Sequence, residues 1–232
     1  MKTRTKAFKT AFPHTIPVLT GFTFLGVAYG ILMNSKGYGT GWTALMSLMA
    51  FAGSAQYVAV TFLTTLFNPL YALAMTLIIN ARHLFYGISM LGKYKDTGKF
   101  KPYLIFGLCD ETFSIVCSTQ APEDVDPNWF YFFITVLDHF YWVLGSVLGS
   151  LLGSLFSFNT KGLDFVLTAL FIVIFLEQWK ARDNRLSSMI GVSVSALCLI
   201  IIGQEHFIIP SMIFILVTLT LLKKHILHRQ EH

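Results

Sequence analysis

The chain has 232 residues, of which 54% are hydrophobic and only 12% are charged, and its mean hydropathy is +0.63. A soluble domain carries roughly 25% charged residues, because its surface must offer enough polar groups to water. These figures exclude soluble enzymes, disordered tails and disulfide scaffolds. Long apolar runs without strand-like alternation predict an all-α integral membrane protein rather than a β-barrel.

Apolar segments follow one another along the chain and are separated by short charged loops. A helix needs about 20 apolar residues to cross the hydrocarbon of a bilayer. The predicted segments are 16–33, 42–66, 70–92, 102–120, 129–157, 163–179, 186–203 and 207–222. We therefore predict a single polytopic domain, residues 1–232, with about six to eight transmembrane segments.

Most cations lie in four clusters between these segments. Fourteen of the 17 Lys and Arg residues lie near the N-terminus, in the loop 93–101, at 180–185 or near the C-terminus. Cytoplasmic loops are enriched in Lys and Arg, so all four clusters and both termini are expected in the cytoplasm. The acidic loop with Glu123, Asp124 and Asp126 is then expected on the opposite side. These loops account for the net charge of +5, and no nucleic-acid partner is expected.

Cytoplasmic placement of every cluster requires an even number of crossings between one cluster and the next. Three segments separate the first two clusters, and three separate the second from the third. One segment in each trio must therefore return to its own side. We predict broken or re-entrant helices at 42–66, which has Gly53-Ser54-Ala55-Gln56 at its middle, and at 129–157, which is too long for one untilted span.

The two trios cover residues 1–92 and 93–179, which are similar in length and both begin on the cytoplasmic side. Transporters are often built from internal repeats with discontinuous helices that meet at the midplane. An internal repeat is therefore possible here, followed by a terminal hairpin, 180–232.

Ionisable side chains near the centre of a span are costly and are candidates for a functional site. Arg82 lies near the middle of 70–92, and Asp110 and Glu111 lie near the middle of 102–120. We expect Arg82 to pair with Asp110 or with Glu111. The pair would belong to a transport site or would be a purely structural ion pair.

Two histidines and a further carboxylate add titratable groups at depth. His83 shares a helix face with Asn80, three residues earlier, and Asp138 is followed by His139. Together with Asp110 and Glu111 they could form a proton relay, since histidine titrates near physiological pH and burial favours neutral carboxyl groups. Their spacing selects no metal, and no metal site is expected.

Small residues suggest two further features. A half-helix that begins at Gly53-Ser54-Ala55-Gln56 would aim its free N–H groups and its positive dipole end at a carboxylate. The alternative is a packing face in an ordinary helix. Glycines four residues apart, Gly145, Gly149 and Gly153, predict a face on which helix backbones approach closely.

Three motifs together resemble one family. The stretches Phe51–Gln56 (FAGSAQ), Asn80–Gly87 (NARHLFYG) and Asp110–Phe113 (DETF) are similar, in order and spacing, to the AzlC family of branched-chain amino acid permeases. The resemblance covers nearly the whole chain, with Ser54 at a position where alanine is common. It implies a bacterial inner-membrane subunit that exports valine, leucine, isoleucine or their analogues, usually with a much smaller membrane partner of the AzlD type.

A zwitterion with an apolar side chain needs an anion for its ammonium, donors for its carboxylate and an apolar pocket. Asp110 or Glu111 could contact the ammonium, and the N–H groups after Ser54, with Gln56, could contact the carboxylate. Gly53 and Asn80 complete the expected substrate-binding set. Motifs for nucleotides, cofactors and hydrolytic enzymes are absent from the sequence, so we expect a proton-coupled secondary transporter and not an enzyme.

Two alternatives stay open at this point. The first is a transporter of another small solute or cation with the same fold. The second, from another class, is an intramembrane hydrolase that uses Asp110 and Asp138.

Overall fold

The structure is a computed structural model, and its described residues are 3–156, 165, 168–169, 172, 175–176, 179, 185–204, 207, 210–211, 213–215 and 217–222. The chain divides into two compact units, Met1–Val166 and Leu167–His232, which are described separately. Every regular element among the described residues is a helix, which confirms the predicted all-α class. Three of these helices are long and apolar enough to cross a membrane, Thr3–Ser35, Pro127–Leu155 and Arg185–Ile202.

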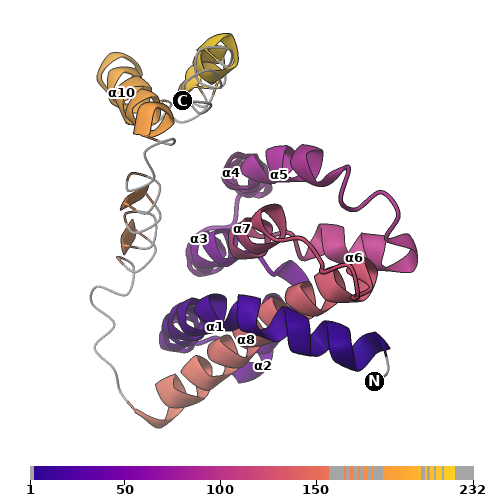
Figure 1. Ribbon diagram of the computed structural model, residues 1–232. Coiled ribbons are helices and arrows are strands. Elements are labelled where there is room, and N and C mark those ends of the chain that lie inside the picture. The colour runs from indigo at the N-terminus through magenta and orange to yellow at the C-terminus, as the bar shows by residue number, and fades with distance from the viewer. Residues whose placement is uncertain are drawn as a thin grey trace. The chain divides into compact units, whose positions relative to one another are not determined.

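Two long helices, α1 (Thr3–Ser35) and α8 (Pro127–Leu155), form the centre of the first unit and lie side by side in Figure 1. They run in the same direction, because Thr15 lies 3.1 Å from the Tyr141 hydroxyl near one end of the contact and Ile31 packs against Gly153 near the other. Helix α8 begins sharply, since the Asp126 side chain accepts the Asn128 N–H and a proline occupies the first turn.

The contact between α1 and α8 depends on small residues. A Cβ at Gly26 would lie 2.8 Å from the Ser146 backbone nitrogen, and one at Gly145 would lie 2.9 Å from the Thr23 carbonyl oxygen. One at Gly30 would overlap the α8 backbone at Ser146. The glycines predicted to form a packing face therefore lie where the two backbones touch, and van der Waals contact holds the helices together.

Helices α2 (Thr40–Ala50) and α3 (Gly53–Thr64) form a pair that returns to the end from which it entered. The Tyr38 hydroxyl, just before α2, donates to the Leu63 carbonyl at the end of α3, 2.8 Å away. The chain reverses at Phe51, whose φ of 38° is in the left-handed region. The sequence predicted a break in this segment.

Helices α4 (Pro69–Asn80) and α5 (Arg82–Met90) follow one another with only a turn at Ala81 between them. Asn68 caps the start of α4, since its side chain accepts the Leu70 and Tyr71 N–H groups at 3.1 Å. The two helices lead from the outer end of α3 to the loop that precedes residue 101, so they act as one interrupted span (Figure 1).

A second returning pair comes from the opposite end. A 3₁₀ turn, η1 (Gly98–Phe100), precedes α6 (Lys101–Phe106), and α7 (Asp110–Ser118) leads back. The ammonium of Lys93 donates to the carbonyls of Val116, Cys117 and Thr119 at the end of α7, with nitrogen–oxygen distances of 3.0 Å to the last two. The loop before α6 and the end of α7 therefore lie together.

The second returning segment is not the one that the sequence predicted. Segment 129–157 was expected to break, but α8 is one unbroken helix, and 102–120 returns instead. The glycines of α8 serve its contact with α1 and interrupt nothing. By contrast, Asp110 and Glu111 lie in the first turn of α7, where the helix dipole favours carboxylates, so a new helix begins there.

The acidic loop is also displaced from its expected position. The Lys6 ammonium forms an ion pair with Asp124, and this hydrogen bond lowers the pKa of Asp124. Arg4 lies over the Trp129 ring, 4.5 Å from its centroid. Because α1 and α8 are parallel, the residues before each of them share one end of the unit. The acidic loop therefore lies beside the N-terminal cations and not opposite them.

In the second unit, α10 (Arg185–Ile202) has one buried residue, Cys198. Most of the predicted segment 163–179 and the cations after residue 222 lie outside the described residues. The total number of spans, the halves 1–92 and 93–179, and the hairpin 180–232 therefore stay predictions.

Replacement of Gly30 by alanine should destabilise the fold by about 1–3 kcal/mol, because the new methyl group overlaps the α8 backbone. Gly21→Ala is the matched control on the same helix, since a Cβ there meets no atom within 4 Å. It should be neutral or stabilise by up to about 1 kcal/mol, as alanine does in an open helix position. Thermal unfolding of the purified protein in micelles measures both, and equal shifts would contradict the close contact.

Single cysteines at Asp96 and Glu123, in a chain without its three native cysteines, should react with an impermeant maleimide from the same side of the membrane. Cysteines at Lys36 and Leu66 should both react from the opposite side, because they flank the first returning pair. Labelling of intact and permeabilised cells measures the sides. Labelling of 96 and 123 from different sides would contradict the second return.

Candidate functional site

Three helix interruptions meet around one side chain, that of Arg82 at the start of α5. Its Nη2 atom donates to the Ser54 hydroxyl in the first turn of α3. The same nitrogen lies 2.9 Å from Oδ2 of Asp110, the first residue of α7. We call the turn between α2 and α3 the first tip and the turn between α6 and α7 the second tip, each with the helix start that follows it. One guanidinium group therefore joins the two tips. About a quarter of the Arg82 and Asp110 side chains is exposed, 28% and 24%, so the ion pair is partly accessible.

The structure selects Asp110, not Glu111, as the partner of Arg82. Asp110 also accepts the Tyr86 hydroxyl through Oδ1 at 2.7 Å. Tyr86 lies four residues after Arg82 and thus on the same face of α5. Its ring stacks on Phe113 of α7, with centroids 4.3 Å apart. Glu111 lies beside Asp110 and is half-buried.

Gln56 holds the first tip in place and is occupied by contacts within the protein. It is 1% exposed, and its amide oxygen accepts from Trp142 Nε1 at 2.9 Å and from the Ala52 N–H at 3.2 Å. Its amide nitrogen donates to the Ser47 hydroxyl at 3.3 Å. Gly53 lies against the same indole, since a Cβ there would be 3.2 Å from the ring. Gln56 therefore positions the first tip, and its predicted contact with the substrate stays a prediction.

Asp138 on α8 supports the second tip. It is fully buried, and its Oδ2 atom accepts the Thr112 hydroxyl at 2.9 Å. Its Oδ1 atom has no hydrogen-bond partner in the described part of the chain. A buried oxygen without a donor is costly, and binding of a proton would remove the negative charge from this position.

His139, the next residue, faces a different neighbour. Its Nε2 atom lies 3.3 Å from the Ser47 carbonyl, which can only accept, so this nitrogen must carry a proton. Its Nδ1 atom lies 2.9 Å from the Tyr103 hydroxyl, which can donate to it. His139 therefore bridges α2 and α6.

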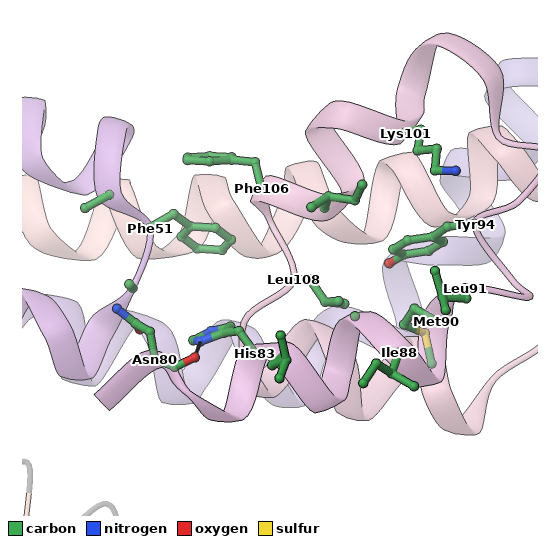
Figure 2. A pocket seen from close by; sticks show the side chains of 15 residues that line it. Phe51, Asn80, His83, Ile88, Met90, Leu91, Tyr94, Lys101, Phe106 and Leu108 are labelled. Atoms are coloured by element: carbon green, nitrogen blue, oxygen red, sulfur yellow. Dashed lines mark hydrogen bonds between the residues drawn. The ribbon is translucent and has the colours of Figure 1, made fainter. Parts of the chain in front are cut away.

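His83 and Asn80 line a pocket of about 580 Å³ between α5, α6 and the first tip. His83 Nδ1 lies 3.2 Å from the Asn80 carbonyl. Figure 2 shows both residues at one end of the pocket beside Phe51, with Lys101 at the other end. The ion pair of Arg82 and the pocket of His83 are thus two adjoining parts of one region.

The predicted site residues thus form separate groups. Ser54, Arg82 and Asp110 meet directly, whereas Asp138 and His139 each support another element of the fold. Asp110 and Asp138, which a hydrolase would need as a pair, are held by different partners. Among the described residues, no three His, Cys, Asp or Glu side chains gather as metal ligands.

Sequence reasoning missed four contributors: Tyr86, Thr112, Trp142 and Lys93. The first could have been found from its position one turn after Arg82 on the same face. Thr112 lies within the DETF motif beside the two carboxylates. Nothing in the local sequence singles out Trp142 or Lys93, because their partners are 86 and 23 to 26 residues away.

The family model described as AzlC protein matches residues 17–156, a range that contains both returning pairs and α8. The chain belongs to the AzlC family. The resemblance inferred from the three motifs is thereby confirmed. This AzlC family chain is a membrane protein, since it has long apolar helices and relatives named as membrane proteins.

Relatives match this AzlC family chain over most of their length. It is 55% identical to the branched-chain amino acid transport protein AzlC of Bacillus subtilis, over 94% of this chain and 86% of that protein. It is 44% identical to an uncharacterized membrane protein of Haemophilus influenzae (94% and 89% covered) and 39% identical to one of Helicobacter pylori (95% and 97%). No solved structure matches the chain.

Arg82→Gln and Asp110→Asn should each lower the free energy of unfolding by about 1.5–3 kcal/mol, because either removes one half of a partly buried ion pair. The double variant should cost less than the sum of the two. The matched control is Lys6→Gln with Asp124→Asn, an exposed pair that solvent screens and that should therefore show much weaker coupling. Thermal unfolding of the single and double variants in micelles measures this double-mutant cycle. If the effects of Arg82→Gln and Asp110→Asn on stability simply add, the two side chains are not coupled.

Proposed function

We propose that this chain is the large subunit of a proton-coupled secondary transporter that exports branched-chain amino acids across the bacterial inner membrane. The observation that carries the proposal is the Ser54–Arg82–Asp110 bridge between two helix starts within the membrane. The name of the Bacillus subtilis relative, a branched-chain amino acid transport protein, agrees with it. The proposal includes a small AzlD-type partner and cytoplasmic termini, which rest on the family and on the cation clusters.

The bridge suits both charged groups of an amino acid. The guanidinium of Arg82 can bind a carboxylate through two parallel N–H groups. The series of intrahelical hydrogen bonds in α3 begins with the Gln56 N–H to the Ala52 carbonyl, 2.8 Å. The N–H groups before it, at Gly53 to Ala55, point from the positive end of the helix and suit the same carboxylate.

The substrate's ammonium group would bind Asp110, with Glu111 one residue away. In the empty protein Arg82 and Asp110 neutralise each other. A bound zwitterion would replace each of them as the other's partner, with its carboxylate at Arg82 and its ammonium at Asp110. Charges inside the membrane would then be compensated in both states, which avoids the cost of an isolated buried charge.

Asp138 is our proposed proton-binding residue. Its unpartnered Oδ1 atom is a place where a proton can bind, and its other oxygen contacts Thr112, two residues after Asp110. Gain or loss of a proton at Asp138 would therefore change the hydrogen bond that holds the α7 tip against α8. Proton binding and the position of Asp110 would thus be linked through one short helix.

The test is counterflow of labelled valine, leucine and isoleucine in proteoliposomes, with this chain alone and with its small partner. Arg82→Gln should lower the initial rate by about tenfold to a hundredfold, the loss expected for a charged hydrogen bond. Lys6→Gln, at the exposed ion pair, should keep the wild-type rate.

Asp138→Asn separates exchange from proton coupling. It should retain counterflow but lose accumulation driven by a pH gradient, because asparagine cannot take up a proton. Exchange that is indifferent to all three amino acids in the wild-type protein would overturn the proposed substrate. Wild-type accumulation by Asp138→Asn would overturn the proposed proton site.

A further inference from the structure

A pocket of about 580 Å³ lies beside the Arg82 bridge and has no role in the charge chemistry described so far. One wall is a face of α5, on which His83, Gly87 and Met90 recur at intervals of three or four residues. Asn80, at the end of α4, and Tyr94, in the turn after α5, extend this wall at either end. The opposite wall comes from α6 and the first tip (Figure 2). Its volume is in the range of about 300–1,000 Å³ that is typical of small-molecule sites.

Polar groups are confined to the two ends of this pocket. Asn80 and His83, which lie on either side of Arg82 in the sequence, are at one end of the pocket, and Tyr94 and Lys101 are at the other. The wall between them is apolar, with side chains such as Phe106, Leu108 and Ile88. A ligand that fits this arrangement has a charged or polar head at the end with Asn80 and His83 and an aliphatic body.

Gly87 stands out in the wall of the pocket. A Cβ built on it meets no atom within 4 Å, so a side chain at this position would extend into free space. The glycines at the two tips, unlike Gly87, have close neighbours. A Cβ at Gly53 would lie 3.2 Å from Trp142, and one at Gly107 would overlap Thr135. Packing against these neighbours explains why Gly53 and Gly107 are glycines. Gly87 has no packing contact that requires a glycine.

We propose that this pocket receives the aliphatic side chain of the transported amino acid, and that Gly87 keeps it wide enough for a branched chain. This inference rests on the proposed function and specifies where the substrate's side chain lies. With the carboxylate at Arg82, a side chain that points along α5 meets the apolar wall at Gly87. Residues larger than glycine at position 87 would exclude leucine and isoleucine before they exclude alanine.

The test measures which amino acids compete with labelled alanine or valine in the counterflow assay. In the series Gly87→Ala, Gly87→Val and Gly87→Phe, the ratio of the inhibition constants for leucine and alanine should rise stepwise, by about tenfold or more at the largest residue. The matched control is Gly41→Phe on α2, where a Cβ also meets no atom within 4 Å and which does not line the pocket. Its ratio should equal that of the wild type.

A second measurement does not depend on transport. A cysteine introduced as Gly87→Cys, in a chain without the native cysteines, should react with a small maleimide, and leucine should protect it more than alanine does. This labelling measurement on Gly87→Cys can be made even if Gly87→Phe does not fold. Equal labelling with and without leucine would overturn the inference.

The outcomes separate this inference from the function on which it rests. If the wild-type protein exchanges none of the branched-chain amino acids, the proposed function fails. If it exchanges them but the Gly87 series lowers exchange of leucine and alanine equally, or not at all, only the side-chain pocket is overturned.

Discussion

The arrangement of the first unit depends on one partly buried guanidinium group between its two returning pairs. A charge removed from water is costly unless it is compensated, and Arg82 forms an ion pair with Asp110 and donates a hydrogen bond to Ser54. These partners lie in the first turns of two short helices, α7 and α3, which belong to returning pairs from opposite ends of the first unit. A single side chain thus determines where both returning pairs stop, and it brings their helix starts to the same place.

Short helices that end inside a membrane need other protein around their backbone groups, and α8 provides it. Within little more than one turn, Asp138, His139 and Trp142 each hold a different element: Asp138 contacts α7, His139 bridges α2 and α6, and Trp142 binds Gln56 of α3. The glycine contact with α1 fixes α8 itself. Helix α8 is therefore the scaffold of the site, although it contributes none of the residues in the Arg82 bridge.

A returning pair follows the long helix α1, as α2–α3, and another follows the interrupted span α4–α5, as α6–α7. The two pairs enter from opposite ends, so their tips meet from opposite directions. In the transport function that we propose, a zwitterion would separate the two halves of this ion pair without leaving a buried charge uncompensated. The pocket beside it adds an apolar compartment on one side of the bridge.

Local composition predicts the membrane class and the break at Gly53-Ser54-Ala55-Gln56, and three motifs carry the likeness to the AzlC family. The cost of a charge in hydrocarbon predicts that Arg82 pairs with one of two carboxylates. Contacts between distant helices were needed to find that 102–120 returns while α8 stays unbroken, and that Asp110 rather than Glu111 pairs with Arg82.

The direction of each helix and the hydrogen-bond partners of Gln56 also could not be predicted from the local sequence. The positions of the cation clusters require an even number of crossings between clusters, but they cannot say which segment turns back or which helices run in parallel. Contacts between residues far apart in the chain decide that, such as Gly26 with Gly145, Lys6 with Asp124 and Gln56 with Trp142. Charge pattern and hydropathy therefore place this chain in a membrane, whereas close packing between distant helices decides which polar groups are left to act on a substrate.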